Sequence, residues 1–526
     1  MKKSLISLTL AATMLMATTA LAASSLTYVV GNESDNYDPG TTSETFAAPI
    51  IGNTFEGLVR TAPDGSMEGA LAKSWEISED GLTYTFKLRD AKWSDGKPVS
   101  SADFIYSWNR VLNPNSGSKN ASMLYHIAGA EEHYADQTVP VSISAADDHT
   151  LSFTLKQRVP YMMQLLAYST FFPVRQDMVE ANPEGWSRDP ATLIGTGPFR
   201  VTEINIGKDV VFEKNPNYWG AANVKLDNLT FRLISNQATA LAAMEAGDVD
   251  GIEAVPPSEI PRLSIESKDF LVIPSLGTTY AFFNPAQKPL DNLNVRKALS
   301  MAIDREEIIE FVLQSADVPA TALIPYGMNV AGQDFRDAAA DYGLGTTAKI
   351  DEAKALLAEA GYPNGEGFPK TIFVTYSSPP IQKLLEAIQQ MWKKNLNIDV
   401  EIAVSEWKVY YPEVQKVEYQ IAQMGWGADY PHPMTFLDNF VSDSPNNLAH
   451  WQNADYDQAI AASKAASNPA ESLAQMTKAE ALIMNDHVIL PMYHRNSYMM
   501  MGGHVKGFWR STLSVPYFRN VSIESK

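Results

Sequence analysis

Strand-like and helix-like hydrophobic patterns alternate along almost the whole of this chain, and this alternation limits its fold more than any other feature. Apolar residues occupy every second position from Leu82 to Leu88, which predicts a half-buried strand. After the turn signal Asp95-Gly96, a serine at position 100 or 101 can cap a helix whose apolar residues recur at helical spacing up to Trp108. Such alternation is typical of mixed α/β domains.

The same pattern recurs in the second half of the chain. One helix is predicted over residues 294–303, where Asn294 can act as the N-cap, and another over residues 351–360. Strand-like runs follow at 370–377 and 398–407. The chain has 526 residues, more than one hydrophobic core normally holds, so we expect two or three domains.

The first 22 residues are typical of a secretory signal peptide. Lys2 and Lys3 precede an apolar run, which ends in the small-x-small sequence Ala20-Leu21-Ala22. A membrane anchor is the alternative, but polar residues interrupt the run, and a bilayer span needs about 20 largely apolar residues. We therefore expect residues 1–22 to be a cleaved signal peptide.

The chain contains no cysteine. This excludes disulfides, thiolate metal sites and a cysteine nucleophile. It also removes the lipid-modified cysteine that would tether an exported protein to a membrane. We expect a soluble protein in the periplasm of a double-membraned bacterium, with release to the medium as the alternative.

The chain is strongly acidic. Its net charge is −20, and removal of Lys2 and Lys3 with the leader takes this to −22. Nucleic-acid binding depends on clustered lysine and arginine residues, and the sequence has no such cluster. We therefore expect no nucleic-acid partner and interpret the charge as an aid to solubility.

Known catalytic motifs are missing from the sequence. It has no G-x-S-x-G, H-E-x-x-H, Walker or G-x-G-x-x-G pattern. Adjacent acidic pairs such as Glu306-Glu307 point apart on a helix. Three histidines with methionines between them, His487, His494 and His504, invite a soft-metal interpretation. Their spacing fits no ligand motif, so we expect no enzyme activity, no metal and no cofactor.

A single carboxylate, Asp429, stands among glycines and aromatic residues in the stretch GWGADYPHPMTF. The residues before it resemble a strand, and glycines in a strand often mark where another backbone comes close. A peptide can lie along such an edge and exchange main-chain hydrogen bonds. Asp429 would then meet the positively charged amino terminus of the peptide. The alternative is that Asp429 only caps the next helix or turns the loop.

Several longer segments carry a resemblance to a known family. In chain order they are TFEGLVRTAPDGSMEGALAKSWEISEDGLTYTFKLRDAKWSDGKPVSSADFIYSWNRVLNP, IGTGPFRV, NPNYWG, VRKALSMAIDREEII, AKALLAEAGYP and GWGADYPHPMTFL. Through their order and spacing, the chain resembles the family-5 extracellular solute-binding proteins, the peptide-binding components of ABC importers, from Thr27 to Val521. It is most similar to the periplasmic oligopeptide-binding and murein-peptide-binding members.

The resemblance implies an α/β clamshell of the periplasmic-binding-protein type (type II, cluster C). In this fold two lobes close over a ligand about a hinge, and an extra domain is attached. We expect a discontinuous first lobe from residues 23–55, 180–277 and 497–526, an extra domain from residues 56–179, and a second ligand-binding lobe from residues 278–496.

The resemblance also assigns candidate ligand-binding residues. The aspartate at the position of Asp429 holds the ligand's amino group in peptide-binding members, and the residues before it provide main-chain pairing. These residues are Gly425, Trp426, Gly427 and Ala428. Trp407 and Tyr280 match aromatic positions that line side-chain pockets, with ordinary core packing as the alternative. Ser43 and Thr45 match, more loosely, a segment that pairs with the other edge of the ligand.

The chain departs from the family pattern where the ligand's carboxylate is bound. Oligopeptide-binding members place arginines at the positions of Gln423 and Val414 and a histidine near the position of Ile381. The arginine that dipeptide-binding members place in that neighbourhood is also missing. A modified peptide, a longer peptide whose end lies elsewhere, and an amine that is not a peptide are all open.

We expect a periplasmic substrate-binding protein that captures short, extended peptides through main-chain pairing and a salt bridge from Asp429 to the ligand's ammonium. As a monomer, it would deliver them to an inner-membrane ABC permease. Bridging waters would permit loose side-chain specificity. One alternative keeps the fold and changes the ligand to a murein peptide, an opine, a nickel chelate or a sugar. A secreted hydrolase is a further alternative, which predicts turnover and a catalytic cluster.

Overall fold

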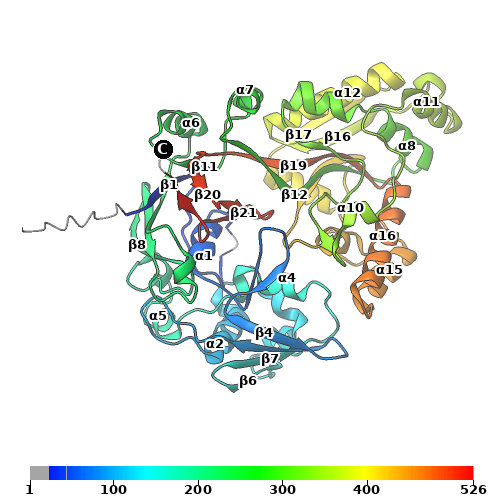
Figure 1. Cartoon of the computed structure of the whole chain (residues 1–526). Coiled ribbons are helices and arrows are strands. Elements are labelled where there is room, and N and C mark those ends of the chain that lie inside the picture. The colour runs from blue at the N-terminus through cyan, green and yellow to red at the C-terminus, as the bar shows by residue number, and fades with distance from the viewer. Residues whose placement is uncertain (1–22, 43, 525–526) are drawn as a thin grey trace, which may run out of the picture.

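The computed structural model describes residues 23–42 and 44–524. The signal peptide predicted over residues 1–22 and the candidate Ser43 lie outside the described residues. Figure 1 shows two lobes joined by long strands, with a third, smaller domain below them. The architecture is mixed α/β, as the alternating patterns predict.

One eleven-stranded sheet runs through both lobes. In spatial order its strands are β17–β16–β18–β12–β19–β11–β1–β10–β9–β8, and β13 pairs with β19 beside this path. Their bounds are β1 (Ser25–Val30), β8 (Phe199–Asn205), β9 (Asp209–Lys214), β10 (Asn228–Leu233), β11 (Gly251–Ile252), β12 (Phe270–Phe283), β13 (Val318–Pro319), β16 (Thr371–Tyr376), β17 (Val400–Ser405), β18 (Ile421–Gly427) and β19 (Ile489–Met501). Strands from both halves of the chain thus lie side by side, since β11 pairs with β1 on one side and with the end of β19 on the other.

Strands β12 and β19 connect the two lobes. They are 14 and 13 residues long and cross from one lobe to the other as an antiparallel pair (Figure 1). Their pairing is irregular at the crossing. Pro274 pairs with Asn496 and Thr278 with His494, so three residues of β12 lie opposite Arg495 of β19. A bulge of this kind bends a strand and increases its twist, so we expect the lobes to move relative to each other at this point.

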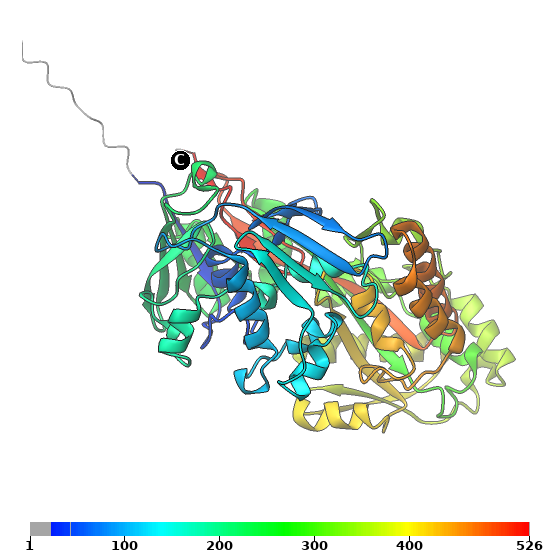
Figure 2. The same ribbon diagram turned by 90° about the horizontal axis from the view of Figure 1, so that it is seen from below.

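The smaller domain contains a four-stranded sheet with the order β4–β5–β7–β6, which Figure 2 shows from below in blue and cyan. Its elements include β4 (Ala72–Ile77), β5 (Thr83–Leu88), α2 (Ser101–Val111), α3 (Ala130–Ala135), β6 (Ile143–Asp147), β7 (Thr150–Thr154), α4 (Met162–Leu166) and α5 (Gln176–Ala181). Trp108 of α2 is fully buried, and its ring lies 5.5 Å from that of Phe153 on β7 and 5.7 Å from that of Phe171. This aromatic core holds the helix on the sheet.

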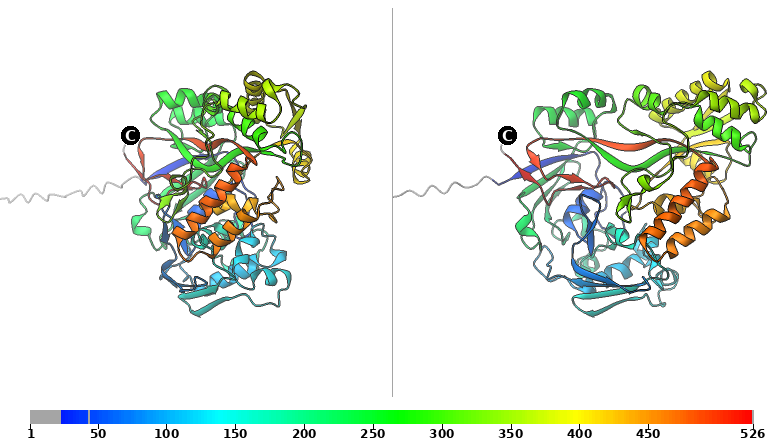
Figure 3. Two further views of the ribbon diagram at one scale, coloured as in Figure 1. Left: turned by 90° about the vertical axis from the view of Figure 1, so that its right-hand side faces the viewer. Right: turned by 45° about the vertical axis from the view of Figure 1, so that its right-hand side comes forward.

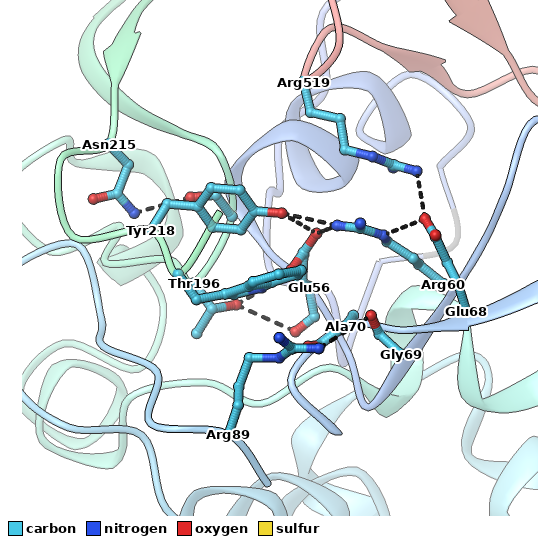
Figure 4. Close-up of polar contacts among 12 residues, drawn as sticks. Glu56, Arg60, Glu68, Gly69, Ala70, Arg89, Thr196, Asn215, Tyr218 and Arg519 are labelled. Carbon is cyan, nitrogen blue, oxygen red and sulfur yellow. Dashed lines mark hydrogen bonds and ion pairs between the residues drawn. The ribbon is translucent and has the colours of Figure 1, made fainter. Parts of the chain in front are cut away.

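A buried polar network fixes the smaller domain to the first lobe (Figure 4). Glu56 is buried, forms an ion pair with Arg60, and accepts a hydrogen bond from the Tyr218 hydroxyl at 2.8 Å. Arg60 also pairs with Glu68 at 2.7 Å, and Glu68 pairs with Arg519 at 3.0 Å. The network thus joins the start of the smaller domain to two separate segments of the first lobe.

Helices cover the sheet in both lobes. The first lobe carries α1 (Ala48–Thr54), α6 (Gln237–Ala246) and α7 (Ile260–Glu266). The second lobe carries α8 (Leu293–Met301), α9 (Arg305–Glu307), α10 (Phe335–Ala338), α11 (Ile350–Glu359), α12 (Pro379–Leu396), α13 (Trp407–Gln415), α14 (Met434–Leu437), α15 (Ala454–Ala465) and α16 (Pro469–Asn485). The last two helices lie side by side, in orange in Figure 3. Helices α8 and α12 share a core that includes Leu299, Leu385 and Trp392.

Most of the elements predicted from the sequence are present. The strand predicted from Leu82 is β5, and Ser100 caps α2 through a capping box with Asp103. The predicted cap of α8 is wrong by two residues. Asn292, rather than Asn294, is the N-cap, because its extended backbone lets its side chain accept a hydrogen bond from the first-turn amide of Asn294.

Candidate ligand-binding site

Asp429 lies just after β18 and shortly before α14. Its backbone N–H donates to Thr435 Oγ1 at 3.0 Å, and the same hydroxyl donates to a carboxylate oxygen of Asp429 at 3.5 Å. The side chain is exposed, yet the surrounding protein desolvates it enough to raise its pKa, while the hydrogen bond from Thr435 acts in the opposite direction. No lysine, arginine or histidine in the described chain forms an ion pair with it. A carboxylate without a protein cation is suited to a cationic ligand group.

Residues of the other two domains approach Asp429. Burial raises the pKa of Tyr168 in the smaller domain, and the nearby charge of Asp429 raises this pKa further. Asn120 forms a side-chain hydrogen bond with Tyr168 and donates to the carbonyl of Thr42 at 3.4 Å. Thr42 comes shortly before the exposed candidate Thr45. The structure therefore brings the segment that contains Thr45 into the same region as Asp429.

Strand β18 has one free edge. Strand β16 pairs with β18 only at Ile421 and Ala422. Beyond these residues β12 pairs with one side of β18 as far as Gly427, and no strand of the described chain pairs with the other side from Gln423 to Gly427. Such an edge offers N–H and C=O groups with which an extended ligand can pair.

Two glycines present their peptide groups to this free edge. The N–H of Ala428 donates to the carbonyl of Leu276 at 2.7 Å, so the groups of residue 428 point toward β12. Because pairing direction alternates along a strand, the groups of Gly427 and Gly425 point away from β12. A Cβ atom added to Gly427 would meet nothing within 4 Å. The edge is therefore open to an approaching backbone at this residue.

Trp426 and Ala428 form the connection between this edge and Asp429. The indole Nε1 of Trp426 lies 3.5 Å from Thr435 Oγ1, the hydroxyl that also contacts Asp429. Both Trp426 and Ala428 pack, partly buried, against the core that the smaller domain and the second lobe share. This packing sets the position of the Asp429 backbone.

An exposed aromatic cluster lies at the other end of the free edge. Trp407 is the first residue of α13 and is 47% exposed. Its ring centroid lies 5.2 Å from that of Tyr376 on β16 and 5.2 Å from that of Tyr411. The hydroxyl of Tyr410 donates to the carbonyl of Gln423. Trp407 therefore lies where a ligand on the free edge would approach β16.

The side chains of Tyr280 and Gln423 are not brought to the surface. Each is 2% exposed. Tyr280 packs against Phe282 and Phe440, and Nε2 of Gln423 donates to the carbonyl of Met424 at 2.7 Å. For Tyr280 this is the core packing that the sequence left as the alternative. A role in binding for these two side chains stays a prediction.

Two of the positions at which the family resemblance implies cations for a ligand carboxylate hold apolar residues in this chain. Val414 in α13 is 0% exposed, and Ile381 in the first turn of α12 is 8% exposed. Neither can bind an anion, and the buried amide of Gln423 carries no charge. A ligand with a carboxylate at this end of the site would therefore need a cation from another residue.

One charged residue at this edge, Arg495, is not among the candidates predicted from the sequence. It lies on β19, and its Nε donates to Thr279 Oγ1 at 3.1 Å. Its guanidinium fills the space over Gly425, where an added Cβ atom would come within 2.1 Å of a terminal nitrogen. The sequence contains one signal that could have found it, a lone arginine within a largely apolar strand-like run.

The histidines that invited a metal interpretation are separated in the structure. His494 hydrogen-bonds to Thr278 Oγ1 at 2.8 Å, and His504 Nε2 lies 2.8 Å from Asp250 Oδ1. Within the described residues, no three histidine, aspartate, glutamate or cysteine side chains gather in a way that could hold a metal ion. In the same part of the chain, no helix has the length and hydropathy to cross a bilayer.

The free edge, the carboxylate at one end of it and the aromatic cluster at the other are suited to an extended ligand with a cationic end. The chain matches the family model described as bacterial extracellular solute-binding proteins, family 5 Middle, over residues 66–447. This chain belongs to the family 5 extracellular solute-binding proteins. It is 33% identical to the dipeptide-binding protein DppE of Bacillus subtilis, over 91% of this chain and 88% of DppE. It is 32% identical to the periplasmic oligopeptide-binding protein OppA of Escherichia coli, over 94% of this chain and 91% of OppA.

Solved structures of family 5 members confirm the predicted fold class. The unliganded open form of MppA, a periplasmic murein tripeptide-binding protein, has a TM-score of 0.84 at 30% identity, covering 96% of this chain and 98% of MppA. Haemophilus influenzae OppA in complex with RPPGFSPFR has a TM-score of 0.72, also at 30% identity, covering 95% of this chain and 99% of OppA. Since the identities are equal, the higher score indicates that the lobes here are arranged more like the open form. An open arrangement agrees with the exposure of Asp429.

Proposed function

We propose that this family 5 protein binds short peptides in an extended conformation and delivers them to an inner-membrane ABC permease. The observation that carries the proposal is Asp429, an exposed carboxylate without a protein cation at the end of a free strand edge. A peptide's α-ammonium supplies the missing cation. Each charge-assisted hydrogen bond between the two groups contributes about 1.5–3 kcal/mol.

Main-chain pairing along β18 sets the direction of the ligand. With its amino end at Asp429, the peptide runs back past Gly427 and Gly425, antiparallel to β18. The peptide groups of both glycines point toward it, and Ser43 and Thr45 belong to the segment proposed to pair with its other edge. Trp407 provides an apolar surface for a ligand side chain. Because main-chain pairing is independent of side-chain identity, this mode of binding tolerates varied sequences.

Closure of the two lobes over the ligand is part of the proposal. The first lobe comprises residues 23–55, 180–277 and 497–526, and the second comprises residues 278–496. The boundaries near residues 277 and 497 coincide with the bulge where β12 and β19 cross between the lobes. The extra domain, residues 56–179, would move with the first lobe, because the network around Glu56 joins them.

We also propose that the protein works in the periplasm as a monomer, without a cofactor and without catalytic activity. The family is one of solute-binding proteins, and OppA of E. coli is named as a periplasmic protein. A hydrolase would release fragments from an incubated peptide mixture. We expect mass spectrometry to detect no new fragments, and protein-dependent cleavage would overturn the assignment.

The amino-terminal contact can be tested with matched peptides. A mixture of tripeptides with uncharged side chains is prepared with free and with acetylated amino termini, and binding is measured by native mass spectrometry after co-purified ligand is removed. We expect free amines to bind about tenfold or more tightly than acetylated ones. Asp429→Asn should remove this preference.

Asp443→Asn provides the matched control, because Asp443 is another exposed carboxylate of the second lobe and lies outside the proposed site. It should keep the preference for free amines. Equal binding of free and acetylated peptides by the unmodified protein would contradict the proposal and favour a ligand that is not recognised through an amine.

A further inference from the structure

Arg495 lies at the point where the two lobes, the free edge of β18 and the bulge of β12 meet. Three residues of β12 lie opposite it, between the pairs Pro274–Asn496 and Thr278–His494. Its aliphatic chain lies against Gly277, where an added Cβ atom would be 3.2 Å from Arg495 Cδ. A larger residue at 277 would displace this chain, so the glycine gives Arg495 its path toward β18.

The guanidinium of Arg495 occupies the space that a side chain at Gly425 on β18 would fill. A Cβ atom on Gly425 would lie 2.1 Å from a terminal nitrogen of Arg495, a distance that no real contact shows. The guanidinium therefore covers Gly425 itself. Because Gly425 also presents its peptide groups to the free edge, a ligand paired there would lie next to this cation.

The terminal nitrogens of Arg495 are available to donate hydrogen bonds to a ligand. Its Nε donates to Thr279 Oγ1 at 3.1 Å, and no hydrogen bond or ion pair links its two terminal nitrogens to another described residue. The nearby carboxylate of Asp317 interacts with it only through its charge. Asp317 is instead occupied by the backbone N–H of Asn496 at 2.8 Å and the hydroxyl of Tyr498 at 2.8 Å. Two terminal guanidinium nitrogens can receive a carboxylate in a fork geometry.

The separation of Arg495 from Asp429 fits a short zwitterion. Asp429 comes four residues after Gly425, which corresponds to roughly 13 Å along extended chain. The ammonium and carboxylate of an extended tripeptide are roughly 10 Å apart, and the two protein side chains bridge the remainder. A ligand with its ammonium on Asp429 and its backbone antiparallel to β18 would thus place a carboxylate near Arg495 after about three residues.

We propose that Arg495 binds a carboxylate of the ligand and takes the place of the cations missing at Gln423, Val414 and Ile381. This inference rests on the proposed peptide-binding function and narrows its ligands to those with a carboxylate about three residues from the amine. The carboxylate can be the C-terminus of a tripeptide or an acidic side chain of a longer chain, and the experiment below distinguishes these sources.

The test measures the preference for a carboxylate, separately from the preference for an amine. Three tripeptide mixtures with free amino termini are compared by native mass spectrometry: uncharged free acids, their C-terminal amides, and amides that contain one glutamate. We expect the unmodified protein to bind free acids about tenfold or more tightly than amides. If instead only the glutamate-containing amides are preferred, Arg495 receives a side-chain carboxylate. Equal binding of all three mixtures would overturn the inference.

Three variants assign the preference to the residue. Arg495→Met should bind acids and amides equally, whereas Arg495→Lys, which keeps the charge without the fork, should keep a reduced preference. Arg262→Met is the matched control, because Arg262 lies on α7 and pairs with Glu245 and Glu259. It should behave as the unmodified protein, and a full preference in Arg495→Met would overturn the assignment.

The two proposals fail in different ways. All Arg495 variants should still prefer free amines to acetylated amines, because that preference belongs to Asp429. If the unmodified protein shows no preference for free amines, the proposed function is overturned. If it prefers free amines but binds acids and amides equally, only the role of Arg495 is overturned. The comparison within the unmodified protein needs no variant, so it stands even if Arg495→Met folds poorly.

Discussion

The carboxylate of Asp429 combines exposure with a raised pKa. It is exposed, and yet desolvation by the surrounding protein raises its pKa. Among the described residues, the hydrogen bond from Thr435 is the side-chain interaction that lowers this pKa. An ammonium ion placed beside it would favour the ionised form and lower its pKa, so ligand binding and ionisation of Asp429 must be linked.

This linkage predicts a pH dependence of binding. A protonated Asp429 does not attract an ammonium, so affinity for free-amine peptides should fall as the pH drops through its pKa. Because that pKa is raised, the loss begins at a higher pH than for an ordinary aspartate. Calorimetry between about pH 7 and pH 4 would measure it. The Asp429→Asn variant should lack this dependence, and identical pH profiles for both proteins would contradict the account.

Gly425 and Gly427 differ in the space available for a side chain. A methyl group at Gly425 would collide with the Arg495 guanidinium and would lie 2.9 Å from the carbonyl oxygen of Thr278, whereas one at Gly427 meets nothing within 4 Å. Gly425→Ala should therefore weaken binding of a free-acid tripeptide about tenfold more than Gly427→Ala, because it displaces the cation from the free edge. Fluorescence or calorimetric titration would measure both variants, and equal losses would show that the guanidinium is not needed there.

The packing of α16 against its neighbours depends on one buried carboxylate, that of Glu480. Glu480 is 0% exposed and forms an ion pair with Arg336, which lies in α10. It also accepts hydrogen bonds from Tyr342 Oη at 2.6 Å and from Ile324 N at 2.9 Å. The carboxylate thus joins α16 to the segment that contains α10, on the side of the second lobe shared with the smaller domain.

Removal of this carboxylate should destabilise the protein strongly. Glu480→Ala leaves the largely buried Arg336 without its ion-pair partner, and breaking a buried pair typically costs about 3–5 kcal/mol of unfolding free energy. Lys478→Ala on the same helix is the control, since Lys478 is exposed and such changes alter stability by about 0.5 kcal/mol or less. Urea unfolding followed by circular dichroism would compare the two. A loss of similar size in both would contradict the role given to Glu480.

Local patterns in the sequence predicted elements better than they predicted the site. Alternating apolar residues identified β5, and cap chemistry identified α2, because both depend on neighbours in the chain. The motif around Asp429 was found through its glycines and through family resemblance. Arg495 was missed because its proposed role depends on β12, β18 and β19 lying side by side, which no local pattern reveals. Tyr280 matched a pocket position through family resemblance, and its ring packs against Phe282, so its role in binding stays a prediction.

At the scale of the whole molecule, only family resemblance suggested a discontinuous first lobe. Local patterns cannot show how segments far apart in the sequence come together. Strands β12 and β19 are separated by about two hundred residues of sequence but form one antiparallel connection between the lobes. The bulge opposite Arg495 lies within this connection, so the proposed carboxylate contact lies between the two lobes.

Ligand binding should therefore make the molecule more compact. The lobes are arranged like the open form of MppA, and closure about the bulge would bring them together. Small-angle X-ray scattering should show a smaller radius of gyration after a free-acid, free-amine tripeptide is added. The Asp429→Asn variant at the same peptide concentration should show a smaller change. An unchanged radius in the saturated, unmodified protein would contradict closure.

The central claim is that Asp429 receives the amino end of the ligand. A crystal structure of the protein with a bound peptide tests it most directly. The account predicts that the peptide's amino nitrogen lies about 3 Å from the Asp429 carboxylate, within hydrogen-bonding distance, with its backbone paired to Gly425 and Gly427. A bound ligand whose amine lies elsewhere, with Asp429 still in contact only with Thr435, would contradict it.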